Sequence, residues 1–199
     1  MKKALFTTSI IFLITFFYST QEGNAQTIVN GSFESAKGYP YKTHLKLYPG
    51  REIVYGWKVF REVDYVGKLW EHAYGNYSID LNGNSAGSIG QIIETIPGYT
   101  YSIQFDVSAN PNCDSEPKYV TVSAADKETT YTVFMDDISN EEMKWRTKFF
   151  SFRATASQSL LLFISMSPGN CGVTLDNVRF TPIAQLPFFS KKEFESISK

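Results

Sequence analysis

Aromatic, acidic and imidazole side chains occur together in one short segment of this 199-residue chain, between two strand-like stretches. The segment contains Trp70, Glu71, His72 and Tyr74. An exposed aromatic ring can stack on the apolar face of a sugar, while a carboxylate and an imidazole hydrogen-bond its hydroxyl groups. We therefore predict a carbohydrate-contacting site here, with Tyr48 from an earlier loop as a further ligand-binding residue. In the alternative, Trp70 caps the fold and His72 is an ordinary surface histidine.

A second motif suggests nucleophilic catalysis, but its context argues against that chemistry. Residues 83–87 fit the G-x-S-x-G pattern of a hydrolase nucleophile elbow. The hydrolase order requires a histidine after the serine, and both histidines, His44 and His72, precede Ser85. The following stretch is β-branched and ends at Pro97, so a strand is at least as favoured as the required helix. With no convergent acid–base set in the sequence, we predict that the protein is not an enzyme.

The first 25 residues predict an export signal. Lys2 and Lys3 precede an apolar run over Ile10–Tyr18, and small residues follow up to Ala25. This run is far shorter than the ~20 apolar residues that a membrane-spanning helix needs. We expect cleavage after Ala25 and a secreted or cell-surface location, without a membrane span. Neither cysteine lies near the cleavage site, so no lipoprotein anchor is expected.

The two cysteines, Cys113 and Cys171, both lie in turn-like sequence. An even pair in an exported chain predicts a disulfide. Neither has a histidine or another cysteine nearby in the sequence, which argues against a metal site. The bridge would hold the loop that precedes the final strand.

The charge balance bears on the partner. The formal net charge is −1, with 19 basic and 20 acidic residues and no basic block. This argues against a nucleic-acid partner and against an anionic membrane surface. Aromatic residues make up 16% of the chain, enough for a core and also for a sugar-binding surface.

Short strands with turn signals between them predict the fold. Counting them gives about ten strands and no convincing helix, which indicates an all-β sandwich or barrel. We expect a long loop over Ser35–Gly56, a strand over Trp57–Val66 with Trp57 in the core, and a hairpin that turns at residues 126–127. Asp80 lies on the polar side of a strand, where it either hydrogen-bonds the following turn or faces a ligand.

The final strand, Gly172–Phe180, changes phase within its length. Its apolar side chains stand first at positions 173 and 175 and then at 178 and 180. A one-residue slip turns every later side chain to the other face unless a β-bulge absorbs it. We therefore predict a bulge at residues 176–177, which gives Asp176 either a ligand role or a solvated edge position.

Five segments in order resemble the DUF642 and choice-of-anchor C group of secreted domains. They are Ile28–Glu34, Gly56–Trp57, Tyr77–Gly83, Gly98–Phe105 and Leu175–Val178, which together span about residues 28–180. The resemblance implies a galactose-binding-like, jelly-roll β-sandwich, similar to several carbohydrate-binding module families. We accordingly divide the chain into a signal peptide at 1–25, a domain at 26–180 and a flexible tail at 181–199.

The resemblance also implies one structural calcium ion near the chain ends, with Glu34 and Asp176 as ligands. Calcium takes six to eight oxygen ligands, so carbonyl groups or waters would supply the rest. In the alternative, Glu34 caps a turn and Asp176 pairs with an arginine such as Arg179. The sequence as a whole predicts a non-catalytic polysaccharide-binding module. An adhesion or matrix module with a protein partner is the main alternative, and a small jelly-roll lyase or hydrolase is a third.

Overall fold

Antiparallel strands build the part of the chain that the structure describes, which is residues 28–40, 43–114 and 116–183 of a computed structural model. Within these residues there are eleven strands and no helix. The predicted signal peptide and most of the predicted tail lie outside the described residues. The all-β prediction is confirmed, with eleven strands in place of about ten.

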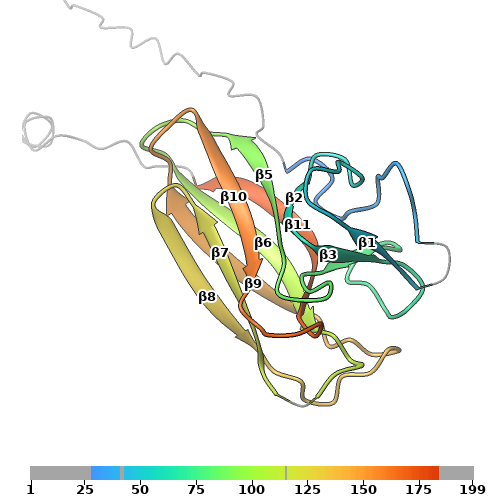
Figure 1. Cartoon of the computed structure of the whole chain (residues 1–199). Helices are drawn as coiled ribbons and strands as arrows, with labels where there is room; N and C mark the ends of the chain where they lie inside the picture. The colour runs from blue at the N-terminus through green and yellow to red at the C-terminus, as the bar shows by residue number, and fades with distance from the viewer. Residues whose placement is uncertain (1–27, 41–42, 115, 184–199) are drawn as a thin grey trace, which may run out of the picture.

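The strands form two sheets that pack face to face (Figure 1). The strands are β1 (His44–Leu47), β2 (Lys58–Arg61), β3 (Val63–Val66), β4 (Ser78–Asp80), β5 (Ser88–Glu94), β6 (Thr100–Ala109), β7 (Lys118–Ala124), β8 (Lys127–Val133), β9 (Arg146–Arg153), β10 (Gln158–Ser165) and β11 (Val173–Ile183). The six-stranded sheet has the order β1-β3-β4-β11-β6-β9, and the five-stranded sheet has the order β2-β5-β10-β7-β8.

Aromatic side chains from both sheets fill the space between them. Successive side chains of a strand point to opposite faces, so every second residue enters this core. Trp57 is 1% exposed and lies with its ring centroid 5.1 Å from that of Phe33 and 6.2 Å from that of Phe163. The prediction that Trp57 belongs to the core is confirmed.

The predicted bulge is present in β11. Asp176 pairs with Asp106, and the next pair joins Arg179 to Gln104, so β11 carries one extra residue at this point. Asn177 adopts a positive φ of 52° there. The bulge keeps the apolar side chains at 173, 175, 178 and 180 in the core despite their change of phase.

Three other segments test the predicted elements. The expected loop over Ser35–Gly56 contains a strand, β1, which pairs with β3. The expected strand over Trp57–Val66 is two strands, β2 and β3, which belong to different sheets. The hairpin of β7 and β8 is confirmed, with its turn at residues 125–126.

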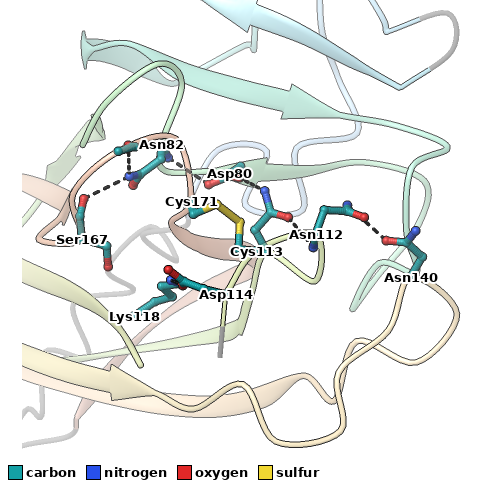
Figure 2. The surroundings of a disulfide bond; sticks show 11 residues. Asp80, Asn82, Asn112, Cys113, Asp114, Lys118, Asn140, Ser167 and Cys171 are labelled. Atoms are coloured by element: carbon teal, nitrogen blue, oxygen red, sulfur yellow. Dashed lines mark hydrogen bonds and ion pairs between the residues drawn. A yellow bond between two sulfur atoms is a disulfide. The ribbon is translucent and has the colours of Figure 1, made fainter. Parts of the chain in front are cut away.

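The predicted disulfide is also present. Cys113 and Cys171 are bonded, with their Cα atoms 5.8 Å apart. Cys113 belongs to the loop between β6 and β7, and Cys171 lies two residues before β11 (Figure 2). The bridge therefore connects two loops at one end of the sandwich.

Two loops cover the outer face of the six-stranded sheet, away from the main core. They are the β3–β4 loop (residues 67–77) and the β8–β9 loop (residues 134–145). Val66, Trp70 and Met143 form a second buried apolar cluster there. Polar side chains lie on this face of the sheet and are nevertheless buried: Ser78, Asp80, Asp106, Ser108, Thr174 and Asp176.

Candidate functional site

The first and last segments of the domain hold the β3–β4 loop through two carboxylates. Oε1 of Glu34 accepts hydrogen bonds from the backbone N–H groups of Asn76 and Tyr77, each at 2.9 Å. Oδ2 of Asp176 accepts one from the backbone N–H of Tyr74, also at 2.9 Å. Gly75 completes the fit, because its φ is +69° and a Cβ atom there would collide with the Glu34 carboxylate.

Asp176 is fully buried and therefore neither solvated nor an edge residue. Its burial raises the pKa of this carboxyl to about 8, although the hydrogen bonds it accepts oppose that shift. The negative charge of Glu34 raises this pKa further. Arg179 does not pair with Asp176; its guanidinium lies 3.7 Å from Asp106.

Trp70 is only 6% exposed, so its ring face is covered and cannot stack on a sugar. Its Nε1 donates a hydrogen bond of 3.0 Å to Oγ of Ser78 on the sheet below. The prediction of Trp70 as a stacking residue is therefore wrong. The alternative, in which Trp70 caps the fold, describes its position.

His72 is half-buried and is held from both sides of its ring. Its Nε2 lies 2.7 Å from the carbonyl oxygen of Gly67, which can only accept, so Nε2 carries a proton. Its Nδ1 lies 3.0 Å from Oγ of Ser78, which can donate to a neutral ring. Burial lowers the pKa of His72, in agreement with a neutral imidazole.

Glu71 links the two covering loops while its side chain remains exposed. Its Oε2 accepts a hydrogen bond of 3.0 Å from the backbone N–H of Met143. Its backbone N–H donates to the carbonyl oxygen of Asn140 at 2.8 Å. Trp145 Nε1 donates to the Glu71 carbonyl oxygen at 3.2 Å. The β3–β4 and β8–β9 loops thus form one connected surface.

A cavity of about 380 Å³ opens where these two loops meet. Its lining residues are Pro40, Lys68, Leu69, Trp70, His72, Asn76, Tyr77, Asn140 and Glu141. The cavity offers amide, ammonium and carboxylate groups beside the phenol ring of Tyr77, whereas both ring nitrogens of His72 are already hydrogen-bonded. Tyr74, in the same loop, is 60% exposed.

The structure groups most of the predicted ligand-binding residues and separates one. Trp70 and His72 line the cavity, and Glu71 and Tyr74 belong to the same loop. Tyr48 does not join them. It follows the end of β1 that pairs with Val63, whereas the β3–β4 loop begins after Val66 at the other end of β3.

The sequence prediction missed four polar residues of the cavity, namely Lys68, Asn76, Asn140 and Glu141. Lys68 and Asn76 flank the predicted segment and could have been included on that ground. Asn140 and Glu141 come from a loop more than sixty residues later. No local pattern connects them to the β3–β4 loop, because tertiary contacts bring the two loops together, namely the packing of Trp70 against Met143 and the hydrogen bonds of Glu71.

The calcium prediction stays a prediction. No group of three or more His, Cys, Asp or Glu side chains arranged to hold a metal ion is found in the described ranges. Glu34 and Asp176 do lie near each other, on either side of one loop. Oε1 of Glu34 already accepts two hydrogen bonds, so a metal ion would be bound through its Oε2 and through Asp176, with carbonyl groups or waters as the other ligands.

A second concave surface lies on the outer face of the five-stranded sheet. It is a groove of about 540 Å³ lined by Gly50, Arg51, Glu52, Gly56, Trp57, Lys58, Phe60, Gly90, Gln91, Ile92 and Leu160. Ile92 is 65% exposed and Leu160 40%. The ammonium group of Lys58 lies 5.4 Å from the ring centroid of Phe60. This groove is more apolar than the cavity beside the β3–β4 loop.

Solved structures with similar folds include three carbohydrate-binding modules. TmCBM61, in complex with beta-1,4-galactotriose, is 12% identical, with a TM-score of 0.46 and coverage of 77% of this chain and 96% of that chain. A family 16 carbohydrate-binding module is 16% identical, with a TM-score of 0.46 and coverage of 77% and 98%. The CBM22-1 xylan-binding domain of Xyn10C from Paenibacillus barcinonensis is 14% identical, with a TM-score of 0.48 and coverage of 74% and 100%.

Sequence comparison finds one curated relative and one family. Halomucin from Haloquadratum walsbyi is 28% identical over 172 residues, which cover 83% of this chain but only 2% of that protein. In the described ranges there is no helix of the length and apolarity needed to cross a membrane. The model of the family described as "Protein of unknown function (DUF642)" matches residues 26–181. The chain therefore belongs to the DUF642 family.

Proposed function

We propose that this protein is an exported, non-catalytic carbohydrate-binding module, and that its sugar site is the cavity beside the β3–β4 loop. One observation carries the proposal: the cavity combines several kinds of hydrogen-bonding side chain with an aromatic ring in about 380 Å³. Sugar hydroxyl groups both donate and accept, and the amides of Asn76 and Asn140 can do the same. Such a mixture suits a polyol better than it suits an apolar ligand.

The backbone of the site is fixed before a ligand arrives. Glu34 and Asp176 hold the β3–β4 loop from below, and Glu71 ties it to the β8–β9 loop. A preformed site loses little conformational entropy on binding, which favours affinity for weakly apolar ligands such as sugars. Tyr74, exposed beside the cavity, would supply the stacking surface that Trp70 does not.

Calcium would strengthen the same framework. Bound between Glu34 and Asp176, it would favour the ionised form of the buried Asp176, whose pKa burial raises to about 8. Its role would be structural, since it pins the loop and the chain ends. We expect added calcium to raise the melting temperature of the wild type and to have a smaller effect on Glu34→Gln.

A glycan array and an insoluble-polysaccharide pull-down, with and without calcium, test the proposal on the mature protein. Tyr74→Ala and Asn140→Ala should weaken binding about tenfold or more, because each removes a direct contact. Tyr119→Ala is the matched control, since Tyr119 is 40% exposed on β7 of the other sheet. If sugar binding persists unchanged in both site variants, the module binds carbohydrate elsewhere and this cavity is not the site.

A protein partner is the second candidate, and the groove on the five-stranded sheet favours it. Phe60, Ile92 and Leu160 give that groove an apolar floor. Exposed apolar surface of this kind is typical of protein contacts. Absence of binding to any glycan by folded protein would favour this candidate. Ile92→Asp would then be expected to abolish binding of the protein partner.

A further inference from the structure

Three buried side-chain oxygens without a hydrogen-bond partner belong to residues that are close to one aspartate in strand register or in sequence. They are Oδ1 of Asp64, Oδ1 of Asn82 and Oγ1 of Thr174, and they are the complete set of such unpaired atoms among the residues that the structure describes. Unpaired buried polar groups cost about 1–3 kcal/mol each, so their clustering calls for a physical reason. The residue at the centre of the cluster is Asp80.

The strand register places these residues around Asp80. Asp64 on β3 is the direct cross-strand partner of Asp80 on β4, and Thr174 on β11 is its partner on the other side. Side chains at directly paired positions have Cβ atoms about 4.5–5.5 Å apart. Asn82 follows two residues later, and its backbone N–H donates to Oδ1 of Asp80 at 2.9 Å. Asp80 therefore does bond the following turn, one of the two roles left open by the sequence.

Hydrogen-bond donors near the cluster are already engaged. Nδ2 of Asn82 donates hydrogen bonds to the carbonyl oxygens of Ser167 at 3.0 Å and Gly169 at 2.7 Å. The other end of this amide, Oδ1, can therefore act only as an acceptor. Lys46 Nζ bonds Oδ1 of Asn84 at 2.7 Å.

The carboxylates have few partners of their own. Oδ2 of Asp80 receives one hydrogen bond of 2.8 Å, from the side-chain amide of Asn110. His44 Nε2 lies 3.8 Å from Oδ2 of Asp64, the other oxygen of that carboxylate. Around Asp80, acceptors therefore outnumber donors, and two of the groups are carboxylates.

We propose that Asp64, Asp80 and Thr174 form a cation site, and that the cation is calcium. An all-oxygen set with two carboxylates matches a hard cation, and calcium tolerates the irregular geometry of such a set. The Asp64 side chain is 16% exposed, which provides an entry path and room for water ligands. This site is separate from the one proposed at Glu34 and Asp176, and it does not depend on sugar binding.

A cation here would join the middle of the six-stranded sheet to the disulfide-linked end of the domain. It would contact side chains from β3, β4 and β11. Asn110, which donates a hydrogen bond to Asp80, lies in the loop that carries Cys113. Figure 2 shows Asp80 beside the disulfide, so the site and the covalent bridge would stabilise the same end of the domain.

Calcium titration by calorimetry of the full mature chain tests the proposal, with Asp64→Asn and Thr174→Val as variants. We expect affinity of about 10⁻⁴–10⁻³ M in the wild type, as in extracellular modules. Asp64→Asn should lose one equivalent of calcium. Glu52→Gln, at an exposed acid outside the cluster, is the control and should lose none. Titration of Glu34→Gln shows which part of the binding heat comes from the calcium site proposed at Glu34 and Asp176.

The Thr174→Val variant distinguishes a calcium-binding role of Thr174 from a purely structural role. Without calcium, this variant should be as stable as the wild type or more stable, because it removes an unpaired buried hydroxyl group. With calcium, it should bind about tenfold more weakly or worse at this site. Unchanged stoichiometry and affinity in both Asp64→Asn and Thr174→Val would overturn the proposal and assign the cluster to a buried water or a shared proton. Should Asp64→Asn fail to fold, Thr174→Val decides alone.

Discussion

Removal of the disulfide is the perturbation whose cost can be worked out most directly. Cys113 and Cys171 are separated by 58 residues. In the chain-entropy model, closing a loop of this length lowers the entropy of the unfolded state by 2.1 plus 1.5R ln n, about 14 cal/mol/K, which is about 4 kcal/mol at 25 °C. Since a whole domain is typically stable by 5–15 kcal/mol, this bridge would supply a large share of the total.

Urea unfolding followed by tryptophan fluorescence measures this cost. With an m-value of about 2 kcal/mol/M, the double variant Cys113→Ala/Cys171→Ala should unfold at a midpoint about 2 M lower than the wild type. Wild type unfolded in the presence of a reductant should shift by a similar amount, which controls for the alanine substitutions. A loss below about 1 kcal/mol in both experiments would refute the reasoning, because it would mean that the unfolded state gains little freedom when the bridge is absent.

Three further predictions follow, two on the framework of the candidate site and one on the packing of the domain. Burial lowers the pKa of His72 in the folded protein, so on acidification the imidazole binds a proton more readily in the unfolded chain. The free energy of unfolding should therefore fall as the pH drops below about 6.5. Urea unfolding at a series of pH values should show a smaller pH dependence for His72→Gln. Glu34→Ala leaves two backbone N–H groups without their acceptor and should cost about 1–3 kcal/mol by thermal unfolding, whereas the exposed Glu52→Ala should cost almost nothing. Gly87→Ala places a methyl group against the carbonyl oxygens of residues 62 and 81. The thermal unfolding midpoint of this variant should therefore drop by several degrees or more. An unchanged midpoint would contradict the close approach of the two carbonyl oxygens to residue 87.

The DUF642 family and the all-β fold could both be predicted from the sequence, because their signals are either local or occur in a fixed order along the chain. The bulge in β11 was predictable from its change of apolar phase, since a strand has only two faces and a slip must be absorbed. The disulfide was predictable because a chain with a predicted export signal and two cysteines has one possible internal pairing. The core position of Trp57 was predictable from the general tendency of aromatic residues to fill protein cores.

The site was predictable only in part. The sequence identified the β3–β4 loop as chemically rich, but it could not establish which ring faces are free. Trp70 is covered because Met143, more than seventy residues later, packs beside it. Burial is a property of what lies opposite a side chain, and local sequence does not contain that information.

The sequence by itself determined the strand-rich character of this protein, its phase slip and its cysteine pair, because these depend on periodicity and composition. The tertiary structure decided which strands are neighbours, and this alone aligned Asp64, Asp80 and Thr174 from three separate strands. It also split the segment 57–66 between two sheets and joined the β3–β4 loop to Asn140. Such groupings arise from long-range pairing and packing, in which each residue's partner lies far away in the chain.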